Sequence, residues 1–410
     1  MLNMDGWGSY MKSPFTFGDP YTGINRMYMK MKAQLMPYIY TTAVSASNID
    51  TGNDDTGLPM VRAMFLEYPE DDYAYTRAMQ YQFMLGANIL VAADEMGNDV
   101  RNHIYLPDAD QVWIDYLTGE KYQGGQVLNN FDAPLWKLPV FVKNGAILPM
   151  YEENNTPDEV NKANRIVEFW PAGNSRYTVY EDDGKYIQNN TEEEDAYGII
   201  DHISYGNHVS TTYTSSVDEG LAVLTAQPSV GSYDGYEAER NTTFIVHMSE
   251  KPESIVAKNG SCCLNVTEVE SKEAFDAKEL NEGEAIFFYE AAPKIHTYAS
   301  KEEVKLAEMV EGVRTAPKLY VKLAKADTKK DTQTVEIKGF VNTFEKMAEQ
   351  ENPNLEAPAL SVPEDGKTSS SICLTWTKQN DADCYEMLVD GRLYAMGNAD
   401  SYEHDDLEYH

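Results

Sequence analysis

Apolar residues in the first part of the chain recur at helical spacing. From Ile24 they fall on an i, i+3, i+4 stripe, at Met27, Met31, Leu35 and Ile39. This spacing is typical of an amphipathic helix, and Thr22 is in position to cap its N-terminus. Pro37 lies inside the pattern, so we expect it to kink the helix or to remove one hydrogen bond.

Shorter apolar runs follow this helix. Residues 58–66 and 88–93 have the length and composition of buried strands, and residues 73–84 are predicted to form a second helix. Helices that alternate with buried strands favour an α/β arrangement with parallel strands.

The pattern changes after residue 93. Short strand-like runs at 102–107, 112–117 and 140–148 are separated by glycine-containing turns, which indicates an antiparallel sandwich. The polar stretch 151–163 has the composition of a linker. We therefore expect a mixed fold with four parts: residues 1–93, a proximal β-sandwich over 94–160, a distal β domain over 164–342, and a partial β module over 355–410.

The strands expected in the distal domain are short and β-rich. They cover 166–170, 177–180, 202–205, 209–213, 221–226, 242–248 and 285–289. The last module has about three strands, which are too few for a closed sandwich.

Composition narrows the classes of function. The 410 residues carry 67 acidic and 33 basic side chains, a formal net charge of −34 that repels phosphate backbones and argues against a nucleic-acid partner. No run of 18 apolar residues predicts a membrane span, and residues 1–15 lack the features of a signal peptide. The four cysteines have no zinc-site spacing, so a structural zinc site is not expected. We assign no metal ligand and no cofactor to the chain.

Several motifs resemble those of glycoside hydrolase family 31, in that family's order. They are Leu35–Tyr40 (LMPYIY), Gly57–Pro69 (GLPMVRAMFLEYP), Gln82–Gly86 with Ile89–Ala92, Trp113–Gly125, Pro139–Pro149 and Tyr177–Gly184 (YTVYEDDG). The resemblance is clear over residues 20–185 and fainter to about 342. Residues 355–410 resemble the start of a fibronectin type III module.

The family resemblance implies a fold and a mechanism. Residues 1–93 would be the C-terminal slice of a (β/α)8 barrel, followed by all-β sandwich domains. Family members are retaining α-glycosidases that use two aspartates, which retention requires to lie about 5 Å apart. Both aspartates precede the matched stretch in this family, so the resemblance assigns no catalytic residue to this chain.

Three residues near the start are candidate substrate contacts. The apolar residues 1–4 run into Asp5-Gly6-Trp7-Gly8, and ligands in barrels bind where strands end and loops begin. Asp5 could accept sugar hydroxyl hydrogen bonds, Trp7 could stack on a sugar ring, and Lys12 is the third candidate. The alternative is a glycine-flanked turn with Trp7 packed on the barrel rim.

Two features leave alternatives open. The chain lacks the R-x-H and EPW motifs of common family 31 glucosidases, which puts glucose specificity in doubt. α-N-acetylgalactosaminides are then the preferred substrates, with α-glucosides, α-xylosides and α-galactosides as alternatives. The acidic run Glu181-Asp182-Asp183 invites a calcium site, but a solvated turn with Gly184 at positive φ is favoured.

The resulting functional expectation is part of a retaining α-glycosidase acting on α-linked oligosaccharides or glycoprotein glycans. The alternative is a non-catalytic β-sandwich array that binds glycans or holds a partner. The module architecture is typical of extracellular or cell-surface bacterial proteins, so we expect that localisation. The sequence does not predict the oligomeric state.

Overall fold

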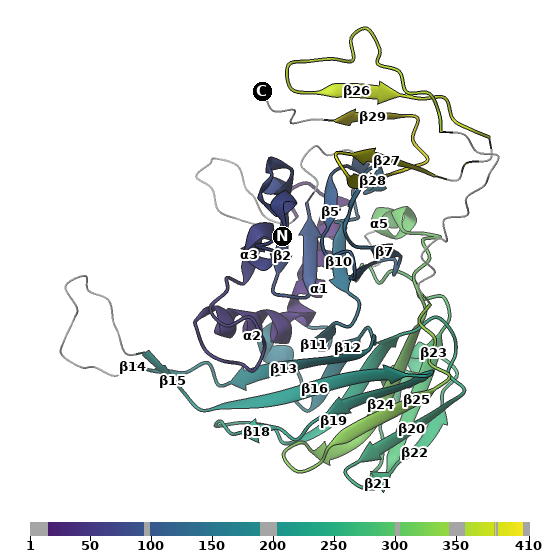
Figure 1. Cartoon of the computed structure of the whole chain (residues 1–410). Coiled ribbons are helices and arrows are strands. Elements are labelled where there is room, and N and C mark those ends of the chain that lie inside the picture. Colours follow the sequence, from purple (N-terminus) through teal and green to yellow (C-terminus); the bar gives the residue numbers. More distant parts are fainter. Residues whose placement is uncertain are drawn as a thin grey trace, which may run out of the picture. The chain divides into compact units, whose positions relative to one another are not determined.

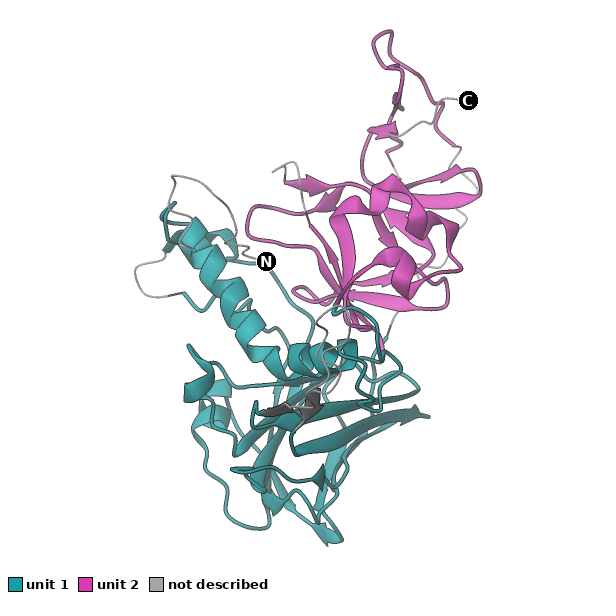
Figure 2. Ribbon diagram, turned by 90° about the vertical axis from the view of Figure 1, so that its left-hand side faces the viewer, with its two compact units in different colours: residues 1–60, 145–343 teal, residues 61–144, 344–410 magenta. Residues whose placement is uncertain are grey.

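The computed structural model describes residues 15–93, 99–188, 203–299, 304–343, 357–380, 382 and 384–404. The chain forms two compact units, each built from two separate stretches (Figure 2). Unit 1 comprises residues 1–60 and 145–343, and unit 2 comprises residues 61–144 and 344–410. The four-part division predicted from the sequence stays a prediction, because the two units are defined by compactness and the four parts by resemblance to a family.

Unit 1 is a β-sandwich with two helices packed on it (Figure 1). One sheet has the order β11 (Ile147–Met150), β12 (Asn164–Phe169), β19 (Glu239–His247), β24 (Lys318–Asp327), β23 (Glu284–Glu290) and β22 (Asn265–Glu268). The other has the order β13 (Asn174–Asp182), β16 (His208–Asp218), β17 (Leu221–Ala226), β25 (Gln333–Lys338), β20 (Ser254–Asn259) and β21 (Cys262–Cys263). The smaller elements are β14 (Tyr186–Gln188), β15 (Ile203–Tyr205), β18 (Val230–Gly231), η3 (Pro157–Glu159), α4 (Lys272–Ala277) and α5 (Val304–Met309).

Alternation along the strands explains why these two sheets pack together. In β16 the side chains of Val209, Thr211, Tyr213 and Ser215 are buried while those between them are partly exposed. Such period-two burial places one face of a sheet against a core. The strands expected in the distal domain coincide with observed strands where the structure describes them, except that residues 170 and 248 lie one position beyond β12 and β19, so the β-rich prediction is confirmed.

The predicted long helix is divided into two. Helix α1 (Tyr21–Gln34) ends before Leu35, and α2 (Met36–Ala46) begins with Pro37 in its first turn. Proline is tolerated there because the first N–H groups of a helix have no intrahelical acceptor. The disturbance expected from Pro37 is confirmed, whereas the predicted cap is wrong: Thr22 lies inside α1, and its hydroxyl donates to the Gly18 carbonyl at 3.2 Å.

Unit 2 contains a sheet with the order β1 (Val61–Ala63), β2 (Gln82–Leu85), β3 (Ile89–Ala92), β10 (Val140–Lys143), β6 (Val112–Asp115) and β7 (Lys121–Gln123). A second sheet has the order β27 (Tyr385–Val389), β28 (Arg392–Gly397), β8 (Gln126–Leu128) and β5 (Ile104–Leu106). The remaining elements are the pairs β4 (Val100–Arg101) with β9 (Phe131–Asp132) and β26 (Ile372–Thr375) with β29 (Ser401–His404), and α3 (Met64–Glu67), η1 (Asp72–Tyr75) and η2 (Arg77–Tyr81).

Two sequence expectations for unit 2 are wrong. Residues 73–84 form two short 3₁₀ helices and then β2 instead of one α-helix, because Thr76 is extended and divides the segment. The neighbouring strands β1, β2 and β3 pair antiparallel rather than parallel. Parallel pairing needs a crossover of a dozen or more residues, and the three residues between β2 and β3 do not allow one.

The core of unit 2 contains residues from both of the sequence stretches that form this unit. Trp113 and Phe141 are completely buried, and Trp376, Tyr394 and Met396 from the C-terminal stretch belong to the same cluster. The fibronectin type III resemblance of residues 355–410 stays a prediction. The structure shows that these residues complete the core of unit 2.

Candidate functional site

The three predicted substrate contacts, Asp5, Trp7 and Lys12, lie outside the described residues. Their geometry therefore contributes nothing to the site, and their assignment stays a prediction. The structure brings polar residues together around strand β13. The acidic run Glu181-Asp182-Asp183 lies at the C-terminal end of this strand.

Each carboxylate of the acidic run has a protein partner. Glu181 Oε1 and Oε2 lie 2.9 and 3.1 Å from Nη1 of Arg240. Asp182 accepts a hydrogen bond from the Tyr40 hydroxyl at 2.8 Å and from the Gly184 amide at 2.9 Å. Asp183 pairs with Lys185 at 3.0 Å. Because adjacent strand residues point to opposite faces, Glu181 and Asp182 meet different partners.

This arrangement supports the turn interpretation of the acidic run. Gly184 has a φ of 69°, a left-handed conformation that glycine adopts without steric cost. Among the residues that the structure describes, no group of three or more His, Cys, Asp or Glu side chains is placed to hold a metal ion. A calcium ion at the turn would have to displace the partners of Glu181 and Asp182.

Helix α2 and the loop after it bind the backbone of β13. The Asn53 side chain accepts from the Thr178 amide at 2.9 Å and donates to the Thr178 carbonyl at 2.8 Å. The hydroxyl of Thr41 accepts from the Tyr180 amide at 3.0 Å. Burial and the neighbouring Asp182 raise the pKa of Tyr40, so its hydroxyl stays protonated and donates. Two of the family-like motifs, LMPYIY and YEDDG, thus meet in space.

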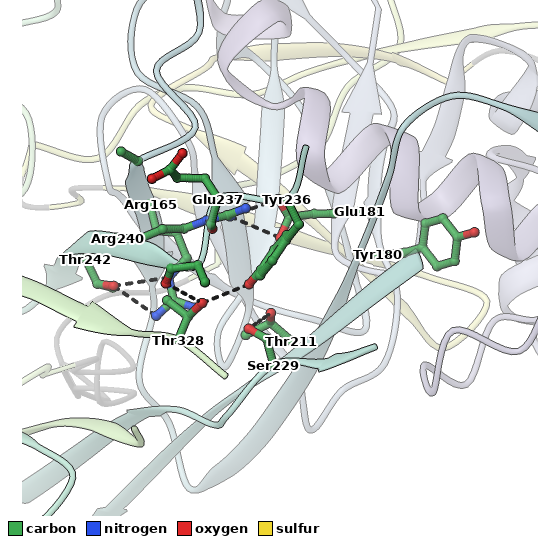
Figure 3. A network of polar contacts seen from close by, with 12 residues as sticks. Arg165, Tyr180, Glu181, Thr211, Ser229, Tyr236, Glu237, Arg240, Thr242 and Thr328 are labelled. Atoms are coloured by element: carbon green, nitrogen blue, oxygen red, sulfur yellow. Dashed lines mark hydrogen bonds and ion pairs between the residues drawn. The ribbon is translucent and has the colours of Figure 1, made fainter. Parts of the chain in front are cut away.

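Two arginines connect the sheets of the sandwich (Figure 3). Arg240 on β19 pairs with Glu181 on β13, and its guanidinium carbon lies 4.6 Å from the centroid of the Tyr236 ring. Arg165 on β12 donates to Thr242 at 3.0 Å and to Gln333 on β25 at 2.6 Å. These pairs could not be predicted from the sequence, since Glu181 and Arg240 are 59 positions apart.

A third buried charge centre lies on the sheet that contains β12, β19 and β24. Glu168 Oε1 lies 2.8 Å from His247 Nε2 and 3.2 Å from Lys318 Nζ, and Trp170 stacks on His247 with ring centroids 4.2 Å apart. Although burial favours the neutral carboxyl, Lys318 and His247 hold the pKa of Glu168 at about 2. A buried carboxylate kept ionised by a lysine and a hydrogen-bonded imidazole is a structural cluster, and it joins the ends of three strands.

The described residues contain no helix long and apolar enough to cross a membrane.

Comparisons with known proteins show what the chain resembles. Residues 57–148 match the model of the glycosyl hydrolase family 31 C-terminal domain. This stretch is therefore a domain of the glycoside hydrolase class, and the chain around it is similar to members of family 31. The match covers β1 to β11 and includes the motifs from Gly57 to Leu148.

Curated relatives and a solved structure agree with this family. The chain is 31% identical over 254 residues to alpha-glucosidase 2 of Bacillus thermoamyloliquefaciens, covering 58% of this chain and 30% of the relative. It is 32% identical over 266 residues to the isomaltosyltransferase of Sporosarcina globispora, covering 60% and 23%. A dextranase of Flavobacterium johnsoniae crystallised with isomaltotriose superposes with a TM-score of 0.59 at 27% identity, covering 81% of this chain and 34% of the dextranase.

The chain thus spans about a third or less of the length of these proteins.

The ion cluster of Glu168 predicts a dependence of stability on pH. The pKa of Glu168 is below its value of 4.5 in the absence of these contacts, so its contribution is complete above that pH and is lost as pH falls toward 2. The lowering corresponds to at most about 3 kcal/mol. Glu168→Gln should therefore flatten the decline of the unfolding free energy between pH 4.5 and 2.5, measured by denaturant titration. Glu279→Gln, at an exposed position, is the control; identical declines in both variants would contradict the cluster.

Proposed function

We propose that this chain is part of a retaining α-glycosidase that hydrolyses O-glycosidic bonds of α-linked glycans. The observation that carries the proposal is the family 31 C-terminal domain at residues 57–148. The relatives named above include an α-glucosidase and a dextranase, both of which act on α-linked glucose polymers or oligomers by their names. Such substrates are neutral, which is compatible with the net charge of −34.

The proposal places the residues before the matched domain in the last part of a (β/α)8 catalytic barrel, while residues 57–93, expected from the sequence to belong to that barrel, fall in the matched domain and pair antiparallel there. Exposed apolar side chains of unit 2 support it: Val61, Phe65, Leu66, Tyr75 and Tyr81 are between 38% and 58% exposed. They lie in β1 and the segment after it, and β1 is the outermost strand of its sheet. The rings of Phe65 and Tyr75 stack with centroids 5.4 Å apart. Exposed apolar side chains at a sheet edge are typical of a surface that packs against further protein.

In a retaining α-glycosidase, the carboxyl groups that catalyse the reaction are distinct from the residues that bind the sugar. A carboxylate attacks the anomeric carbon and a carboxylic acid protonates the leaving oxygen, about 5 Å away. In this proposal both carboxyls belong to residues outside this chain. Asp5, Trp7 and Lys12 would bind the sugar and orient its anomeric carbon toward that pair. The absence of R-x-H and EPW motifs leads us to propose α-N-acetylgalactosaminides as the first substrates to assay.

The first prediction concerns the isolated chain. Because the proposal assigns no carboxylate pair to this chain, the purified 410-residue protein should hydrolyse no nitrophenyl α-glycoside of glucose, xylose, galactose or N-acetylgalactosamine. Release of nitrophenol is the measurement, with a full-length family 31 α-glucosidase as the positive control. Turnover at ordinary enzyme rates, on the order of 1–1000 per second, would show that the chain contains its own catalytic pair.

The second prediction concerns Trp7 in the intact enzyme. Trp7→Ala should lower kcat/KM by on the order of 100-fold, equivalent to about 3 kcal/mol, since a stacking contact is lost and a cavity is left. Val230→Ala, which shortens an exposed apolar side chain on β18 outside the predicted subsite, should leave kcat/KM near the wild-type value. Equal values for both variants, with unchanged circular dichroism, would remove Trp7 from the subsite.

We also propose that the intact protein is exported to the cell surface or medium. The fibronectin-like C-terminal residues support this, because such modules act as spacers in extracellular bacterial glycosidases. Fractionation of the source culture, with immunoblotting of each fraction, tests it. Export predicts protein in the medium or envelope with a cleaved leader; protein found only in the cytoplasm would refute export without affecting the proposed reaction.

A further inference from the structure

The C-terminal hairpin of β27 and β28 is joined to unit 2 through strand β8. Strand β28 pairs with β8 in parallel over three positions, Leu393 with Gln126, Tyr394 with Val127 and Ala395 with Leu128. Parallel ladders need two well-aligned strands, and a three-residue ladder alone is a weak connection. Contacts outside the ladder must therefore hold the hairpin in place.

One end of β28 is held by the turn after β8. The Asn129 amide donates to the Ala395 carbonyl at 2.9 Å, and the Asn130 side chain donates to the Met396 carbonyl at 2.9 Å. The side chain of Met396 is 1% exposed and belongs to the core of unit 2.

Arg392 holds the other end of β28. Its guanidinium carbon lies 4.1 Å from the centroid of the Tyr73 ring and 4.9 Å from that of Tyr105. Its Nη2 lies 3.7 Å from Oδ1 of Asp71. Asp71 also accepts hydrogen bonds from the Tyr105 hydroxyl and, at 3.0 Å, from the Tyr73 amide, so residues outside the hairpin already position these groups around the guanidinium.

The two anchors together determine the register of β28. A slip by one residue would turn Tyr394 and Met396, which are 5% and 1% exposed, away from the core. Arg392 suits this position because a planar guanidinium can lie against aromatic rings and still reach a carboxylate, whereas a lysine ammonium is a compact point charge.

We propose that Asp71, Tyr73, Tyr105 and the edge of β8 opposite β5 form a strand-acceptor surface that recognises a β-strand beginning with arginine. Its occupant is the hairpin of residues 385–397 of this chain, with Arg392 as the anchor. The acceptor residues all lie within the range 57–148 that matches the family domain, and the hairpin lies outside it. The hairpin therefore adds a strand to the family domain and covers an edge of its sheet.

Amide hydrogen exchange tests the anchor directly, because the Asn129 amide donates to the hairpin. Arg392→Ala in the full chain should speed exchange at Asn129 by about tenfold or more, as expected when a docked segment opens locally. The Gly125 amide, which donates to Leu106 on the other side of the sheet at 2.7 Å, should keep its rate. Arg392→Lys should have an intermediate effect, and Arg77→Ala, at an exposed position in the same unit, should have none.

A second arm uses a synthetic peptide of residues 385–404. Added in excess to the Arg392→Ala chain, the peptide should restore the protection of Asn129, and the same peptide carrying Arg392→Ala should not. Unchanged exchange at Asn129 in the Arg392→Ala chain would overturn the proposal. So would equal acceleration at Asn129 and Gly125, because Arg392 would then support the fold of unit 2 as a whole rather than the docking of a strand.

Discussion

Strand β13 lies at the edge of its sheet, so half of its backbone groups need partners that no neighbouring strand provides. Exposed edges of this kind invite pairing with other chains. Here side chains take the place of the missing strand: Asn53 bonds both the amide and the carbonyl of Thr178, and Thr41 bonds the amide of Tyr180. Helix α2 is fixed to the sandwich by the same contacts, so one set of bonds covers the edge and positions the helices.

The sandwich itself depends on charges placed between its sheets. A buried guanidinium is costly unless it is paired and hydrogen-bonded, and removal of one partner leaves the other uncompensated. Arg240 satisfies this condition through Glu181 and the ring of Tyr236. Arg165 is only 6% exposed, and its polar partners on Thr242 and Gln333 are neutral. Such bonds are directional, and they restrict how the two sheets can be placed more narrowly than apolar packing would.

The sequence predicted those parts of the fold that depend on local periodicity. Short β-rich runs identified the strands of the distal domain, and the spacing from Ile24 identified the helical segment with its break near Pro37. The motif order indicated the family whose C-terminal domain model matches residues 57–148. Local patterns failed where an element was too short for its period to show, as in residues 73–84, where Thr76 interrupts the helix. They also failed for strand direction, which depends on how much chain connects β2 to β3.

The site was less predictable than the fold. The acidic run was visible in the sequence, and the glycine after it indicated a turn. Its partners were not visible, because Arg240 and Tyr40 are brought to it by the sheet pairing and by α2. Nothing near His247 or Lys318 in the sequence indicates that both meet Glu168, since such clusters form only once β12, β19 and β24 are side by side. For Asp5, Trp7 and Lys12 the structure offers no comparison.

The division of unit 2 into two stretches of sequence has a consequence for synthesis on the ribosome. Unit 1 is complete once residue 343 has emerged, whereas Trp376, Tyr394 and Met396 of the unit 2 core are made later. Residues 61–144 therefore have an incomplete core while about 200 further residues are translated, which takes on the order of 10–40 seconds at ordinary rates of translation. The fold thus assigns an order to its own assembly, in which the later stretch of the chain closes the unit that began earlier.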